Sequence, residues 1–77
     1  YSLATRPEAR GKGVGTALIE AAERAAKRRG CAALRLEVRV DNASAISLYE
    51  RLGYRRIGQY PGYYEDGADA WRLEKRL

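Results

Sequence analysis

A chain of 77 residues has room for one small domain, and chains of this size bury only about 60% of the surface that they expose when unfolded. The composition, with 45% hydrophobic and 32% charged residues, excludes a disordered or collagen-like chain, and no apolar run approaches the roughly 20 residues that span a bilayer. Cys31 is the single cysteine, which excludes an internal disulfide and favours a reducing cytoplasm. The sequence contains no histidine, which excludes a histidine-based catalytic pair and a histidine metal site.

The net charge of +5 is unevenly distributed along the chain. Residues 1–40 contain nine Lys/Arg and four Asp/Glu, whereas residues 41–77 contain six of each. The whole excess of positive charge therefore lies in the first half and indicates an anionic partner there. A nucleic acid, a phosphorylated cofactor and a solvated helix face all remain open at this point.

Residues 1–5 are short, β-prone and partly apolar, and they predict a strand that Pro7 ends. An apolar stripe at helical spacing then predicts an amphipathic helix that Gly30 terminates. Glu20 and Glu23 are expected on its solvent side. The stripe consists of Val14, Ala17, Leu18, Ala21, Ala22 and Ala25.

Apolar and charged residues alternate from residue 34 to residue 40, which predicts a strand with one buried face. Strand, helix and strand in this order predict a parallel βαβ unit. Glu37 falls on the polar face of the strand between Arg35 and Arg39. By itself, this position favours a simple cross-strand ion pair.

Asp41 or Asn42 is predicted to cap a shorter second helix with an apolar stripe that includes Tyr49, and Gly53 ends this helix. Residues 54–60 and 70–77 read as two further strands, and the turn residues between them predict a hairpin. The expected fold is a single α/β domain over residues 1–77, with a mixed sheet in the order β-α-β-α-β-β.

The densest motif is the run Arg10, Gly11, Lys12, Gly13, Val14, Gly15 and Thr16, between the first strand and the first helix. Alternate glycines let backbone N–H groups turn toward a phosphate, and the start of a helix adds positive charge. The run fits neither the dinucleotide-binding fingerprint nor the Walker A motif. The alternative is a glycine-rich connector that only turns the chain.

This motif resembles the acetyl-CoA pyrophosphate loop of the GCN5-related N-acetyltransferases (GNAT). A second block, which runs from Leu36-Glu37-Val38-Arg39 through Asn42 and Leu48-Tyr49 to Gly53-Tyr54, resembles the same superfamily. Together with Tyr63-Tyr64, it is most similar to the branch that acetylates the alanine of a ribosomal protein. The resemblance implies the acyl-CoA N-acyltransferase (GNAT) fold and covers only its C-terminal portion, without the N-terminal strands and helices.

The resemblance also implies roles for individual residues. Backbone groups at Leu3 and Thr5 match the strand that meets the acetyl carbonyl and the pantetheine arm, and residues 10–16 match the pyrophosphate loop. Asn42 matches a residue that contacts the cofactor arm. Glu37 matches the general base and Tyr49 the general acid.

These residue types suit acetyl transfer on chemical grounds. An α-amino group has an ordinary pKa of about 7.7–8.0 and must lose its proton before it attacks a thioester, and a carboxylate accepts such a proton. The departing thiolate needs a proton, which a tyrosine hydroxyl supplies. Taken singly, Tyr49 is equally well explained as a core residue and Asn42 as a helix cap.

The sequence therefore predicts a cytoplasmic N-acetyltransferase that uses acetyl-CoA and no metal. Its acceptor would be a primary amine, either a protein N-terminus or a small molecule. The alternatives are a basic nucleic-acid-binding module and an inert CoA-binding fragment. No membrane contact is expected. The first strand would form an unpaired edge that invites a homodimer or another partner.

Overall fold

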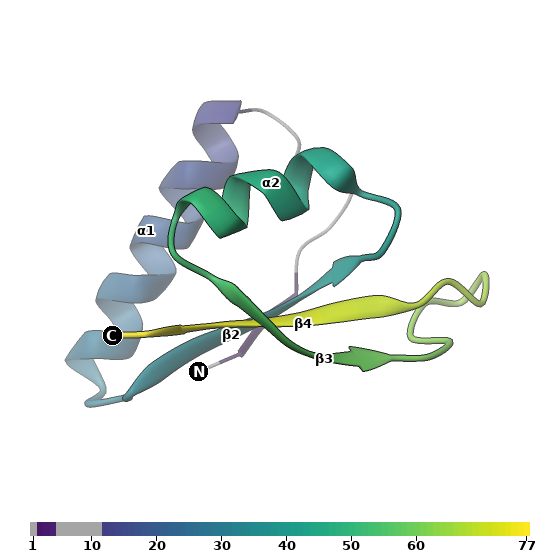
Figure 1. Cartoon of the computed structure of the whole chain (residues 1–77). Helices are drawn as coiled ribbons and strands as arrows, with labels where there is room; N and C mark the ends of the chain where they lie inside the picture. Colours follow the sequence, from purple (N-terminus) through teal and green to yellow (C-terminus); the bar gives the residue numbers. More distant parts are fainter. Residues whose placement is uncertain (1, 5–11) are drawn as a thin grey trace.

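The computed structural model describes the backbone of residues 2–4 and 12–77 and the side chains from residue 16 onward. Its elements follow the expected order: β1 (Ser2–Ala4), α1 (Lys12–Arg28), β2 (Ala33–Arg39), α2 (Ala43–Arg51), β3 (Arg55–Tyr60) and β4 (Ala70–Arg76) (Figure 1). Thr5, Arg10 and Gly11 of the predicted cofactor site lie outside the described residues.

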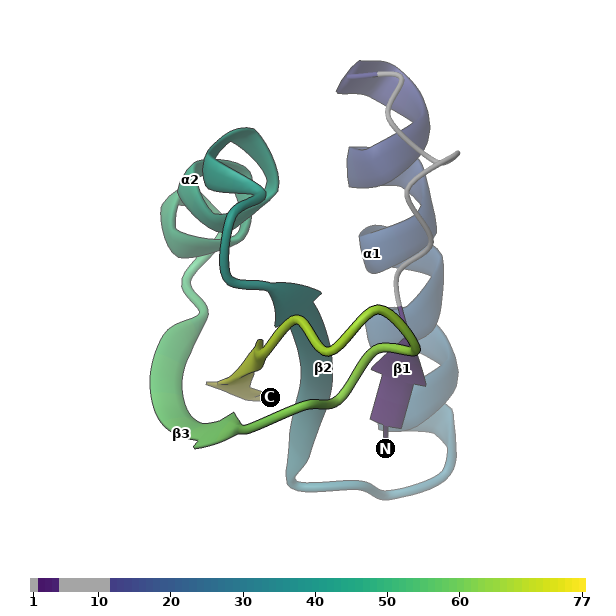
Figure 2. The same cartoon turned by 90° about the vertical axis from the view of Figure 1, so that its right-hand side faces the viewer.

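The four strands form one mixed sheet in the order β1-β2-β4-β3. β1 pairs with β2 in parallel, as the predicted βαβ unit requires, and β4 pairs antiparallel with both β2 and β3. The predicted hairpin is therefore confirmed, with a bulge between Arg56 and Gly58 of β3. Figure 2 shows β1 at one edge of the sheet and β3 at the other.

Both helices pack on the same face of the sheet. The predicted alternation in β2 places Leu34, Leu36 and Val38 on this face, and the antiparallel register brings Leu73 of β4 beside Leu36. The core formed here contains these four residues together with Ile19, Ala22, Tyr49 and Tyr54. It connects both helices to both central strands.

The helix α1 presents a different face to the core from the one that the sequence pattern predicts. Ile19, Ala22 and Ala26 are buried, whereas Ala17 and Ala21 are exposed and Leu18 is 49% exposed. Ala22 of the expected stripe is buried and Ala25 partly so, but the centre of the buried face lies about one residue further along, a rotation of roughly 100° about the helix axis. One consequence is that Glu23, which we expected on the solvent side, lies half-buried with its side chain 17% exposed.

α1 also begins earlier than the predicted boundary between loop and helix. It starts at Lys12, so Gly13 and Gly15 belong to its first turn rather than to a preceding loop. The first four N–H groups of a helix have no acceptor within the helix. The backbone donors of this motif are therefore aligned by the helix itself.

α2 confirms the predicted capping. The side-chain oxygen of Asn42 accepts a hydrogen bond from the backbone N–H of Ala45 at 3.2 Å. Gly53 follows the helix with a φ angle of +101°, a left-handed conformation that favours glycine. Tyr49 is buried at 3% exposure on the predicted apolar stripe.

The opposite face of the sheet carries cross-strand pairs of charged residues. Arg35 faces Glu74, and Glu37 faces Arg72 in the register of β2 and β4. The Arg35 Nε atom lies 2.7 Å from a Glu74 carboxylate oxygen, and this pair is partly exposed. Glu37 differs from the expected polar-face residue because it is buried, at 6% exposure.

No helix among the described residues is long and apolar enough to cross a membrane.

The edge position of β1 generates a prediction about association. β1 offers backbone groups on the side away from β2, and such edges pair readily with other chains. We expect the 77-residue chain, expressed alone, to self-associate in a concentration-dependent way, which sedimentation velocity measures. A longer natural polypeptide that contains this chain should associate less. A monodisperse monomer with a sharp cooperative melt would contradict this expectation.

Candidate active site

The candidate site lies where the parallel pairing of β1 and β2 ends. The pairing runs from Ser2 and Arg35 to Ala4 and Glu37. α1 begins after the carboxyl end of β1, and α2 begins directly after the carboxyl end of β2 (Figure 1). In open α/β sheets, ligands bind outside the carboxyl ends of parallel strands, where helix N-termini supply positive charge. This end of the sheet therefore suits an anionic ligand.

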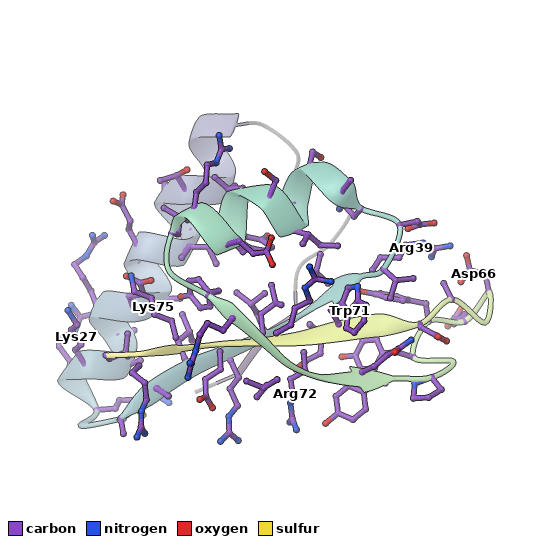
Figure 3. All side chains as sticks on the ribbon, viewed as in Figure 1. Lys27, Arg39, Asp66, Trp71, Arg72 and Lys75 are labelled. Atoms are coloured by element: carbon purple, nitrogen blue, oxygen red, sulfur yellow. The ribbon has the colours of Figure 1, made fainter. Side chains whose placement is uncertain are left out.

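Glu37 is a buried carboxylate in a polar setting. Its side chain is 8% exposed, and one oxygen lies 3.8 Å from the Nε atom of Arg72. The hydroxyl of Tyr63 lies 3.4 Å from the other oxygen. The arginine stabilises negative charge on the carboxylate. The side chain of Arg72 lies on the side of the sheet away from the helices (Figure 3).

Tyr63 belongs to an aromatic cluster between β3 and β4. Its ring stacks on Tyr60 with the centroids 5.5 Å apart, and it meets Tyr64 edge-on at 5.0 Å. The guanidinium of Arg72 lies over the Tyr60 ring, 5.0 Å from its centroid. Burial and the neighbouring Glu37 carboxylate raise the pKa of Tyr63, so its hydroxyl stays protonated. The cluster thus forms one wall beside Glu37.

The loop between β3 and β4 is also tied to the end of β2. Arg39 binds Asp66 and lies 3.0 Å from Asp41, and its guanidinium lies over the Tyr64 ring (Figure 3). Asp69 accepts hydrogen bonds from the Gly62 N–H and the Gln59 side chain, both at 2.8 Å. These contacts hold the tyrosine cluster close to Glu37.

Tyr49 lies on the other side of the sheet from Glu37. It belongs to the core beneath the helices, and its ring meets Tyr54 edge-on with the centroids 6.3 Å apart. Glu37 points to the opposite face, because side chains alternate along β2. The structure therefore does not bring the two predicted catalytic side chains into contact. Tyr49 lies in the core between α2 and the sheet, and Glu37 lies on the opposite face of the sheet.

The predicted cofactor residues divide into three groups. Leu3 lies in β1 opposite Leu36, and Lys12, Gly13, Val14 and Gly15 lie in the first turn of α1, where their backbone is described. Thr16 follows in α1 and is half-buried. Asn42 uses its side-chain oxygen as the cap of α2, which leaves its amide group outside that role. The cap and the cofactor contact are compatible.

Sequence reasoning assigned no role to Arg72, Tyr60 and Tyr63. The adjacent Tyr63-Tyr64 pair before Asp66-Gly67 was the only signal for this cluster in the sequence. Its contact with Glu37 depends on the hairpin that folds residues 55–76 back along β2. Among the described residues, no group of three or more His, Cys, Asp or Glu side chains could hold a metal ion.

This arrangement is that of an acetyltransferase domain, and the chain belongs to the acetyltransferase (GNAT) family. The family model matches residues 1–54. The resemblance noted in the two sequence motifs is thereby confirmed.

Individual relatives narrow the similarity further. An N-alpha-acetyltransferase of Saccharolobus solfataricus is 40% identical over 77 residues, which are 99% of this chain and 46% of the relative. The ribosomal-protein-S18-alanine N-acetyltransferase of Escherichia coli is 39% identical, with a TM-score of 0.73, over 92% of this chain and 48% of that one. A chain of the NatC complex bound to Gag peptide and CoA is 30% identical, with a TM-score of 0.81, over 99% of this chain and 50% of that one. The chain therefore spans about half the length of the relatives it matches.

The first turn of α1 generates a prediction about anion binding. Gly13→Val places a branched side chain where a phosphate must approach the backbone N–H groups. We expect CoA affinity to fall at least about tenfold, roughly the value of one charge-assisted hydrogen bond, while the circular dichroism of the helix persists. Ala21→Val on the exposed side of α1 is the matched control. Equal CoA binding by the Gly13 variant in calorimetry would show that this turn does not hold the pyrophosphate.

Proposed function

We propose that this chain carries the cofactor-binding and proton-transfer part of an acetyl-CoA-dependent N-acetyltransferase. The observation that supports this most directly is the buried carboxylate of Glu37 where the β1–β2 pairing ends, with Tyr49 buried under the other face of the sheet. The buried Glu37 lies on one face of β2, and the buried Tyr49 lies on the other. Membership of the GNAT family and the similarity to a CoA-bound NatC chain support the choice of cofactor.

The binding step uses backbone groups more than side chains. In this proposal, the pyrophosphate of acetyl-CoA lies at the first turn of α1, where N–H groups that have no acceptor within the helix and the helix dipole favour negative charge. The thioester then lies beyond Ala4, where the described pairing of β1 with β2 ends. Backbone N–H groups at such a strand end stabilise the oxyanion of a tetrahedral intermediate. Asn42 would contact the arm of the cofactor through its amide group.

The acceptor amine approaches from the face that carries Glu37. The carboxylate takes the proton from the ammonium group, directly or through a water molecule, and the neutral amine attacks the acetyl carbonyl. Tyr63 and Arg72 hold the carboxylate from two sides. A new C–N bond forms, and the carbonyl oxygen carries the negative charge of the intermediate.

The leaving group departs toward the face that carries Tyr49. When the intermediate collapses, the C–S bond breaks and the Tyr49 hydroxyl donates its proton to the thiolate of CoA. The nitrogen releases its second proton to solvent as the amide forms, and the Tyr49 phenolate takes a proton back from solvent. Base and acid act on different atoms of the reaction, so they need no contact with each other. Attack is direct, without an acyl-enzyme or a metal. The positions on opposite faces of β2 fit this division.

The acceptor proposed is a primary amine, either a protein N-terminus or a small molecule. The names of the relatives, among them N-alpha-acetyltransferases and an alanine N-acetyltransferase of a ribosomal protein, favour the α-amine of a protein. The family match does not favour the alternative of a nucleic-acid-binding module. The cytoplasmic location and the association through β1 remain predictions from the sequence.

Tyr49→Phe tests the general acid. Phenylalanine keeps the ring and its packing against Tyr54, so only the hydroxyl is lost. General acids typically contribute about 10²–10⁴-fold, so kcat in the natural polypeptide that contains this chain should fall by that order. CoA affinity, measured by calorimetry, should change less than about twofold. An unchanged kcat would make Tyr49 a core residue and remove it from the mechanism.

Glu37→Gln tests the general base through its pH dependence. At pH 7 most α-amino groups are protonated, so loss of the base should lower kcat/KM by about 10²-fold or more. Near pH 9.5 the amine is already neutral, and the deficit relative to the unsubstituted protein should shrink to less than about tenfold. Glu74→Gln, which breaks the neighbouring Arg–Glu pair on the same face, is the control and should be near neutral. A deficit independent of pH would argue for a structural Glu37.

A further inference from the structure

A second carboxylate, which is half-buried, lies on the helix side of the sheet. One oxygen of Glu23 in α1 accepts a hydrogen bond from the Tyr54 hydroxyl at 2.8 Å and lies 3.2 Å from the Nζ atom of Lys75 in β4. The ammonium group of Lys75 also lies over the Tyr54 ring, 5.8 Å from its centroid. The labelled Lys75 in Figure 3 lies near the carboxyl end of β4, next to α1. Three separate parts of the chain meet at this carboxylate.

The network is well protected from water. Tyr54 is 2% exposed, and the Glu23 and Lys75 side chains are 17% and 31% exposed. Burial and the hydrogen bond to Glu23 raise the pKa of Tyr54 far above its ordinary value, so its hydroxyl remains a donor. Buried polar groups are costly unless they are paired. Two polar contacts to one carboxylate oxygen therefore help to fix the positions of the groups that they join.

Tyr54 contacts Tyr49 in two ways. Its backbone N–H donates to the Tyr49 carbonyl oxygen at 3.0 Å, and the two rings meet edge-on at an interplanar angle of 67°. The Tyr54 ring therefore packs against Tyr49, and its hydroxyl is hydrogen-bonded to Glu23 of α1. Rotation or displacement of Tyr54 would release Tyr49 as well.

We propose that Glu23, Tyr54 and Lys75 form a positioning unit that fixes the position of the Tyr49 ring relative to α1. The inference rests on the proposed function, in which α1 binds the pyrophosphate and Tyr49 protonates the sulfur of the same acetyl-CoA molecule. None of the three residues touches the reacting atoms. They act by fixing Tyr49, the proposed acid, relative to α1, the helix that is proposed to hold the pyrophosphate of acetyl-CoA.

Such positioning has a large kinetic effect, because a displacement of about 1 Å at a reacting group costs up to about 10²-fold in rate. The hydrogen bond from Tyr54 to Glu23 is polar and directional, whereas the remaining core around Tyr49 is largely aliphatic. Aliphatic packing tolerates small rotations better than a hydrogen bond of fixed length does. The hydroxyl of Tyr54 is therefore the polar anchor through which α1 and β4 act on the position of Tyr49 in this proposal.

The test is a double-mutant cycle in the natural polypeptide that contains this chain. Tyr54→Phe removes one hydroxyl, and we expect kcat to fall about tenfold, within the range for misplaced reacting groups, with KM for acetyl-CoA nearly unchanged. In the Tyr49→Phe background, the same substitution should have no further effect on kcat. An equal fold loss in both backgrounds would overturn the proposal, because a general structural role does not depend on the Tyr49 hydroxyl.

A spectroscopic measurement separates failure of this proposal from failure of the proposed function. With ring-labelled tyrosine, NMR reports how fast the Tyr49 ring flips, and we expect faster flipping in Tyr54→Phe. If Tyr49→Phe leaves kcat intact while the Tyr49 ring flips faster in Tyr54→Phe, the acid assignment fails and the positioning unit stands. If the Tyr49 ring is unaffected by Tyr54→Phe, the positioning unit is overturned whatever the kinetics show.

Three further variants control for the hydrogen-bond acceptor of Tyr54 and for stability. Glu23→Gln keeps an oxygen that accepts from Tyr54, whereas Glu23→Leu removes it, so kcat should be retained in the first and lowered about tenfold in the second, as in Tyr54→Phe. Ile19→Val removes one methylene from the same core without touching the network. If Ile19→Val with a matched loss of melting temperature lowers kcat equally, the effect is one of stability and the proposal fails.

Discussion

The alternation of side chains along β2 is the constraint on which the rest of the structure depends. β2 pairs with β1 on one side and β4 on the other, and its residues point in turn toward and away from the helices. Leu34, Leu36 and Val38 build the core beneath α1 and α2, while Glu37 faces the other way. A shift of one residue in register would exchange the two sets, burying charge under the helices. The placement of Glu37 on the face opposite the core that contains Tyr49 follows from this single geometry.

Glu37, which is buried, and Glu23, which is half-buried, have similar surroundings on opposite faces of the sheet. Each carboxylate meets a tyrosine hydroxyl and a cation from β4: Tyr63 and Arg72 at Glu37, Tyr54 and Lys75 at Glu23. The difference lies in access to a substrate. Glu37 lies where the pairing of β1 with β2 ends, and there we propose proton transfer. Glu23 lies on α1 and faces the segment after α2, and there we propose a positioning role.

The GNAT family match and the spatial arrangement both concern the part of the fold that this chain contains. The chain spans about half the length of its relatives, so it supplies the helix starts and the strand end of the candidate site. The rest of a full-length relative corresponds to chain that this sequence does not contain. The proposed acceptor amine and the proposed roles of Glu37 and Tyr49 both come from the likeness to the family, whereas the burial and the partners of these two side chains come from contacts within the chain.

The sequence by itself determined the element order, the parallel β1–β2 pairing, the hairpin and the cap at Asn42, because periodicity and turn residues are local signals. It failed for α1, where alanines on several sides of the helix left the buried face ambiguous, and Glu23 was placed in solvent. It also failed for the burial of Glu37. Only the tertiary structure decided both, because the groups that bury these carboxylates come from β4 and from residues after α2. These contacts join residues 26 to 52 positions apart, a separation that no local pattern records.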